Sequence, residues 1–168
     1  MHTETLGREA VMMLSHRFLR HIENRSEALA KGLLHKVQQS ARTEAFRKVP
    51  PDELTERVSE IYHHLGEWLL NKSEADIEQL YARVGARRAQ QGVPLSQVIW
   101  AIILTKDNLF EFILDDSYPD RPIELFGKQE LLQLLDQFFE RAIYAAAVGY
   151  EQEAEGKART ESKTRKAA

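Results

Sequence analysis

Residues 94–115 read PLSQVIWAIILTKDNLFEFILD and form the most apolar helical stretch of the chain. Placed at steps of about 100° around a helix, their apolar side chains fall into two groups. One face carries Leu95, Val98, Ile99, Ile102, Leu109 and Ile113, and much of the remainder is covered by Trp100, Ile103, Leu104, Phe110 and Leu114. A helix that is apolar nearly all round has to be buried on several sides or to lie in an oligomer interface. The stretch therefore predicts a helix enclosed by other helices or by a second chain.

The same helical spacing of apolar residues recurs along the rest of the chain, without the strict alternation that marks a strand. Further helices are expected over residues 5–40, from Asp52 to Asn71, from Ser73 to Gly92, and from Ile123 or Lys128 into the mid-150s. In the first of these, the polar residues Asn24, Arg25 and Ser26 interrupt the apolar stripe that begins with Val11 and Leu14. One long helix and two abutting helices both fit that pattern.

Local signals mark where the helices begin and end. Asp52 is placed as an N-cap, and Ser73 with Asp76 three residues later has the spacing of a capping box. Gly92 suits the position just after a helix end, and Pro94 suits the first position of the next helix. Residues 43–51 are expected to be a connector and residues 117–122 a turn.

These elements predict an all-α fold with about five amphipathic helices in a globin-like or helical-bundle packing. The periodicity does not choose between the two, because helix crossing angles are not written in it. We expect residues 1–155 to form a single regulatory domain. Residues 156–168 are polar and are expected to be a disordered tail.

Composition narrows the class of protein. The 168 residues are 43% hydrophobic, which supports a packed core, and the net charge of -3 argues against a dedicated nucleic-acid binder. Cysteine is absent, which fits a reducing compartment. The longest apolar run, residues 98–104, is far shorter than the roughly 20 residues of a membrane span. The start carries no signal-peptide pattern, so we expect a cytoplasmic protein with no membrane contact.

No pattern of catalytic or phosphate-binding residues occurs in the sequence. Glu60 with His63 has the Glu-x-x-His spacing of di-iron bundles, but His63 points opposite the apolar face. None of the six histidines lies at the centre of an apolar stripe, where an axial haem ligand would have to be. We therefore expect no enzyme activity, no cofactor and no metal.

Two charged side chains fall on apolar faces. Arg88 shares its wheel angle with Tyr81, and Lys106 falls among Ile102 and Leu109. Each has a structural explanation, because Arg88 can neutralise a helix end and Lys106 can keep its ammonium group in water. The functional alternative is a polar pocket between the helices of residues 73–92 and 94–115, in which Arg88, Lys106 and Tyr81 hold an anionic or carboxylate ligand.

Small residues line one part of the last helix, in the stretch from Tyr144 to Tyr150 and just before it. The residues concerned are Ala142, Ala145, Ala146 and Gly149. Small side chains let a neighbouring helix come close, so the stripe predicts either tight packing within the chain or the seam of a homodimer.

The stretch from Leu80 to Phe112 resembles the N-terminal sensory domain of the RsbR/RsbRD family of RsbT co-antagonists. The residues that carry the resemblance are Gly85, Arg88, Ala89 and Gly92, followed by Leu95 and Lys106. The resemblance implies a globin-related, non-haem sensory module that is regulatory and often dimeric. In that family it is coupled to a C-terminal output domain, for which we see no room after residue 150, so we expect an isolated sensor or a fragment.

The sequence thus favours a non-catalytic sensory domain that acts in signal transduction, within a stress response, through protein contacts and a possible small ligand. We expect it to be a homodimer with a protein partner in a signalling pathway. The alternative is a haem- or metal-binding protein of the globin or di-iron type, used for redox chemistry or gas sensing.

Overall fold

The computed structural model describes Met13, residues 15–115 and residues 122–167. The described residues contain a helical segment over 15–24, α2 (Ser26–Gln39), the 3-10 helix η1 (Ala41–Lys48), α3 (Pro51–His63), α4 (Leu65–Leu70), α5 (Glu74–Gln90), α6 (Leu95–Leu114) and α7 (Pro122–Ala167). No strand occurs among them. The predicted all-α class is confirmed, but these eight helical segments exceed the predicted five. Globin-like packing stays a prediction.

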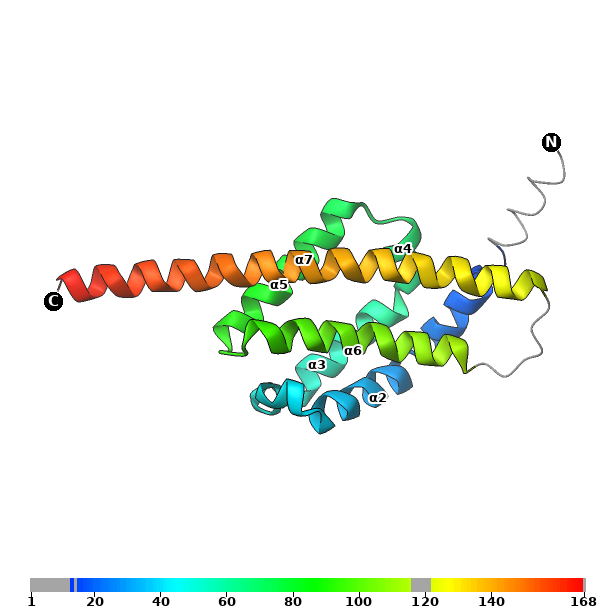
Figure 1. Ribbon diagram of the computed structural model, residues 1–168, viewed down its shortest axis with the longest axis horizontal. Helices are drawn as coiled ribbons and strands as arrows, with labels where there is room; N and C mark the ends of the chain where they lie inside the picture. The colour runs from blue at the N-terminus through cyan, green and yellow to red at the C-terminus, as the bar shows by residue number, and fades with distance from the viewer. Residues whose placement is uncertain (1–12, 14, 116–121, 168) are drawn as a thin grey trace.

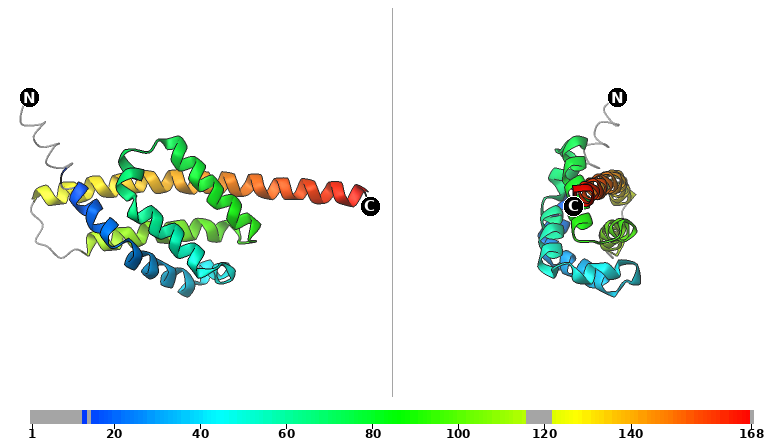
Figure 2. Two further views of the ribbon diagram at one scale, coloured as in Figure 1. Left: turned by 180° about the vertical axis from the view of Figure 1, so that it is seen from behind. Right: turned by 90° about the vertical axis from the view of Figure 1, so that its left-hand side faces the viewer.

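The two longest helices set the shape of the molecule. α6 and α7 run along its long axis, and the C-terminal part of α7 extends beyond every other element (Figure 1). α5 packs against α7 over much of its length, while α2 packs against α3 and α6. The end-on view of Figure 2 shows α3 and α4 beside the pair formed by α6 and α7. Among the described helices, none has the combined length and apolar character that a membrane span requires.

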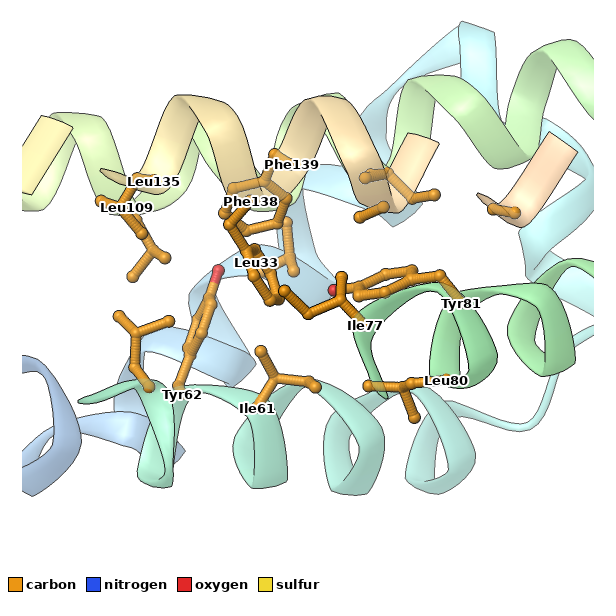
Figure 3. Packing of buried hydrophobic residues seen from close by; sticks show 14 of the residues in the cluster. Leu33, Ile61, Tyr62, Ile77, Leu80, Tyr81, Leu109, Leu135, Phe138 and Phe139 are labelled. Carbon is orange, nitrogen blue, oxygen red and sulfur yellow. The ribbon is translucent and has the colours of Figure 1, made fainter. Parts of the chain in front are cut away.

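Apolar side chains from all of the long helices meet in one continuous core (Figure 3). The largest fully buried members are Tyr62, Phe139, Ile22, Leu65, Leu109, Ile113, Leu131 and Leu135. α6 contributes Val98, Ile102, Leu109 and Ile113 from one face, as its periodicity predicts. This burial removes apolar surface from water and is the main force that holds the helices together.

Two of the helical stretches expected from the sequence are each divided into two helices in the structure. The first break is at Arg25, so the N-terminal region consists of two abutting helices, one of the two alternatives. The second is at His64, which divides the predicted helix from Asp52 to Asn71 into α3 and α4. The Glu23 carboxylate accepts a hydrogen bond of 2.8 Å from the backbone N–H of Gly66. This bond from another helix satisfies a free donor in the first turn of α4.

Some of the predicted helix ends are confirmed by the structure and others are wrong. The capping box is confirmed, since Ser73 Oγ accepts from the Asp76 N–H and an Asp76 carboxylate oxygen accepts from the Ser73 N–H. Gly92 follows α5 with a φ of 70°. The Asp52 N-cap is wrong: α3 already begins at Pro51, because proline fits the first helical turn. Pro94 precedes α6 as its N-cap instead of being its first residue.

The segment predicted as a connector is a compact helical turn. η1 covers most of residues 43–51, and the buried Thr43 hydroxyl donates a hydrogen bond of 2.6 Å to the carbonyl oxygen of Val37. Phe46 and Val49 are buried beside it. Thr43, Phe46 and Val49 are the buried side chains of this mostly polar segment. Three positions are too few for a helical period to be recognised in the sequence.

At the other end of the chain, the structure differs from the predicted disordered tail over residues 156–168. α7 continues as a helix to Ala167, with almost every residue after Tyr150 exposed. Val11, Leu14 and residues 117–121 of the predicted turn lie outside the described residues.

Candidate functional site

An apolar cavity of about 80 Å³ lies between α2, α3, α5 and α6. Most of its wall is aliphatic and comes from Ala30, Leu33, Leu34, Val37, Leu54, Val58, Ile61, Leu80, Val84, Val98, Ala101 and Ile102, with Phe46 from η1. Four polar side chains complete the lining, namely Arg57, Tyr81, Arg88 and Thr105. A cavity that is mostly apolar and has a few polar groups is the usual form of a small-molecule site.

Tyr81 brings a hydroxyl group to this cavity from α5. Its side chain is 7% exposed, and its ring packs edge-to-face on Phe138 with centroids 5.8 Å apart. Burial raises the pKa of the Tyr81 hydroxyl, against a smaller opposing effect of the Arg57 charge. The group is therefore protonated and able to donate a hydrogen bond at neutral pH.

The second buried tyrosine of the core, Tyr62 on α3, has its hydrogen bonds within the protein. Its hydroxyl donates to the Thr105 carbonyl oxygen at 2.9 Å and lies 3.4 Å from the Asn108 amide nitrogen. The Tyr81 hydroxyl, in contrast, has no such hydrogen bond, and because no fully buried side-chain polar atom of the described residues lacks a partner, its oxygen atom is open to the cavity. Figure 3 shows both rings reaching from their helices into the interior.

Arg88 is buried at the end of α5 and is held by a polar cluster. Its Nη1 atom lies 2.7 Å from Glu53 Oε1 and 2.5 Å from Gln91 Oε1. Arg87 and Gln91 also donate to the Glu53 carboxylate. Burial acts to raise the pKa of Glu53, but the hydrogen bonds and charges of Arg87 and Arg88 outweigh it and lower this pKa to about 2.

Burial lowers the pKa of Arg88 from its ordinary value, and the adjacent Glu53 works in the opposite direction. The guanidinium group also lies over the Phe46 ring, 5.8 Å from its centroid. Arg88 is thus a neutralised structural cation that ties α3 to α5 at one end of the cavity. Its charge is already compensated by Glu53.

Lys106, which the sequence groups with Arg88 and Tyr81, does not line this cavity. Its ammonium nitrogen lies 2.9 Å from Asp136 Oδ1 and bridges α6 to α7. The side chain is 25% exposed and passes over the Phe110 ring. The structure therefore brings Arg88 and Tyr81 together and separates them from Lys106, and it replaces the predicted polar pocket with an apolar one.

The small-residue stripe of α7 is occupied within the chain. Ala142, Ala145, Ala146 and Gly149 are all buried. A Cβ atom added to Gly85 of α5 would lie 1.9 Å from the Ala146 carbonyl oxygen, and one added to Gly149 would lie 2.0 Å from the Ala82 carbonyl oxygen. The two backbones are thus in direct contact, so the predicted dimer seam is not available for a second chain.

The described histidines lie on the surface. His16, His21, His35, His63 and His64 are all exposed. In the part of the chain that the structure describes, no group of three or more histidine and acidic residues is arranged to hold a metal ion.

Sequence reasoning missed Arg57 and the role of Glu53. Arg57 is exposed at the rim of the cavity, and it lies three residues after Leu54 and four before Ile61 on the apolar side of α3. That spacing on the apolar side of the helix could have identified Arg57 as a residue near the core. Glu53 gave no such signal, because its partner Arg88 lies 35 residues away on another helix.

Comparison with known proteins gives one match. No curated protein matches the chain, and no solved structure does. A family model described as the RsbT co-antagonist protein RsbRD N-terminal domain matches residues 27–165. The match includes every helix that lines the cavity and most of α7, and it confirms the resemblance seen around Gly85 and Gly92. The chain belongs to the RsbRD N-terminal domain family.

Proposed function

We propose that this chain is a cytoplasmic, non-catalytic sensory domain that regulates a stress-response signalling pathway through contacts with other proteins. The observation that carries the sensory role is the apolar cavity, which is lined by the Tyr81 side chain and has Arg57 at its rim. The family description names a co-antagonist of RsbT, which supports a regulatory role and a protein partner of the RsbT type.

The helix packing supports a route from the cavity to the surface. The cavity is lined by α2, α3, α5 and α6, and α5 is in backbone contact with α7 at Gly85 and Gly149. A ligand that favours one position of α5 also favours one position of α7, because that contact leaves no room for the two helices to move independently. The signal is then a shift between two populated arrangements.

A homodimer is part of the proposal, with its interface on α6. Ile99, Ile103 and Leu114 fall within about 60° of one another on this helix at 100° per residue, and all three are partly or largely exposed. These three apolar side chains are not among those that pack against the core of the chain. A second copy as the occupant agrees with one of the two alternatives that the sequence leaves open for residues 94–115, burial against a second chain.

The partner contact is tested by direct binding. We expect the full chain to bind a purified RsbT-type protein saturably in isothermal titration calorimetry. The exposed end of α7 carries a group of cations, and the triple variant Lys157→Glu, Arg159→Glu, Lys163→Glu is expected to weaken binding at least tenfold. Lys31→Glu, a charge reversal at an exposed position of α2, is the control. No saturable binding by the unmodified chain contradicts the proposed partner.

The haem alternative is tested by the absorption spectrum of the purified protein. We expect no Soret band, because the described histidines all face solvent and none offers an inward axial ligand. A Soret band with one haem per chain that survives dialysis would overturn the non-haem assignment.

A further inference from the structure

The polar groups of the cavity that remain free are donors. Arg88 has its charge compensated by Glu53 and its Nη1 atom shared with Gln91. The Thr105 hydroxyl donates to the Ala101 carbonyl oxygen at 2.8 Å. The Tyr81 hydroxyl, whose oxygen atom is not fully buried, and the Arg57 guanidinium group form no hydrogen bond or ion pair with any described residue.

The two free donors, the Tyr81 hydroxyl and the Arg57 guanidinium group, belong to the same cavity. Tyr81 and Arg57 both line this cavity, and the positive charge of Arg57 acts to lower the pKa of the Tyr81 hydroxyl. The free groups are thus a neutral donor inside the cavity and a cation at its rim, and the Glu53 carboxylate is already engaged by Arg87 and Arg88. A ligand that completes this arrangement has to bring hydrogen-bond acceptors and negative charge.

The remainder of the cavity wall is apolar and suits an aliphatic part of a ligand. Most of its wall is made of aliphatic side chains such as Leu33, Val37 and Ile102. The volume of about 80 Å³ is roughly half that of an engineered 150 Å³ cavity that takes up benzene. An aliphatic chain of about three to five carbons is therefore the size that fits without rearrangement.

We propose that the cavity binds a short aliphatic carboxylate of about four to six carbons, with its chain among Leu33, Val37 and Ile102 and its carboxylate accepting from the Tyr81 hydroxyl beside Arg57. This inference rests on the proposed sensory function and names the class of its ligand. A singly charged carboxylate suits the site better than a phosphate, because the cost of removing charge from water beside aliphatic walls grows with the charge.

The chain-length dependence is the first test. Acetate, butanoate, pentanoate, hexanoate and octanoate are titrated into the full-length protein, and binding is followed by the shifts of backbone amide NMR signals. We expect the dissociation constant to fall about fourfold for each methylene group that enters the cavity, and to stop falling near hexanoate. 1-Butanol and 1-pentanol, which lack the charge, are expected to bind at least tenfold more weakly than the acids of equal length. No saturable shift with any acid, or equal binding of acids and alcohols, overturns the proposal.

Tyr81→Phe separates a ligand contact from a structural role. The hydroxyl has no partner in the protein, so its removal leaves the stability of the free protein unchanged or higher, whereas it weakens pentanoate binding about tenfold. Tyr144→Phe, at an exposed tyrosine of α7, is the control and leaves binding unchanged. A Tyr81→Phe protein that is less stable and binds pentanoate as tightly as the unmodified chain contradicts the proposal.

Two further variants test the rim and the volume. Arg57→Gln is expected to weaken pentanoate binding but not 1-pentanol binding, with Arg83→Gln on the exposed side of α5 as its control. Ala30→Leu fills the cavity and abolishes binding of both, while Ala28→Leu, exposed on the same helix, leaves binding unchanged. Arg57→Gln with unaltered affinity for the acid contradicts the carboxylate assignment.

The outcome for the ligand can be told apart from the outcome for the proposed function. If the chain binds an RsbT-type protein and no acid of the series, the ligand class is wrong and the regulatory function stands. If it binds pentanoate in the cavity and no such protein, the ligand class stands and the regulatory partner is wrong.

Discussion

Gly85 and Gly149 fix the contact between α5 and α7 at the level of single atoms. We expect Gly85→Ala to destabilise the protein by about 2–3 kcal/mol, because the added Cβ overlaps backbone that cannot move away alone. This cost exceeds the gain of about 1 kcal/mol that alanine brings to a helix interior. The measurement is the free energy of unfolding in urea.

Gly32→Ala is the matched control for this prediction. Gly32 lies inside α2 with no atom within 4 Å of the added Cβ, so only the gain in helix propensity applies. We expect it to stabilise the protein by up to about 1 kcal/mol. Equal stabilities for the Gly85→Ala variant and the unmodified protein would contradict the backbone contact.

Glu53 makes the stability depend on pH in the acid range. Its pKa is about 2 in the folded protein against 4.5 for the free group, so the folded state binds this proton less readily than the unfolded state. The stabilisation is therefore complete above pH 4.5 and is lost as the pH falls from 4.5 towards 2. We expect Glu53→Gln to flatten the stability profile over that window and to cost about 1–3 kcal/mol at neutral pH, because Arg88 loses its counter-charge.

Glu56→Gln, on an exposed part of the same helix, is the control for that profile. Urea unfolding at a series of pH values between 2 and 7 measures both variants. A Glu53→Gln profile as steep as that of the unmodified protein would show that the steepness arises elsewhere.

For Lys106 we expect a substitution to have almost no effect, in contrast to Gly85 and Glu53. It bridges α6 and α7 through a partly exposed ion pair with Asp136 and has no part in the cavity lining. We expect Lys106→Met to change the unfolding free energy by no more than about 0.5 kcal/mol and to leave pentanoate binding as it is. A change in ligand affinity comparable to that of Tyr81→Phe would place Lys106 in the site after all.

At the scale of the helices, periodicity predicts which elements form and which faces are buried. It identifies α5 and α6 almost to the residue, because a capping box, Gly92 and Pro94 mark their ends. It cannot detect the break at His64, since Ile61, Leu65 and Trp68 keep a helical spacing across it. Just after the break, the Gly66 N–H donates to Glu23 of a different helix, a contact that periodicity does not contain.

The same distinction applies to the site. The wheel position of Arg88 and Tyr81 brings them together in prediction and in structure, because both lie on α5. Lys106 satisfies the same rule on α6 beside Ile102, which does line the cavity, but the Lys106 side chain bridges to Asp136 of α7 instead. Which helix a face meets is decided by tertiary packing, and one-dimensional periodicity does not contain that information.

At the scale of the whole molecule, the side of α6 that carries Ile99, Ile103 and Leu114 predicts the oligomeric state. We expect a mass of twice 19.4 kDa in multi-angle light scattering, and a mass of one chain for Ile103→Glu, because the charge cannot be buried in an apolar interface. Leu70→Glu, at an exposed leucine of α4, is the control and keeps the double mass. A single-chain mass for the unmodified protein rules out the homodimer.

The projecting end of α7 has a mechanical consequence. Residues 154–167 continue the helix past its last contact, that of Glu153 with Gln90 of α5, which at about 1.5 Å per residue gives an arm of about 21 Å. A tilt of about 5° where α7 crosses α5 displaces the tip of such an arm by about 2 Å. Motions too small to be noticed among the packed side chains near Gly85 thus become displacements the size of a side-chain contact at the far end, where a second protein can register them.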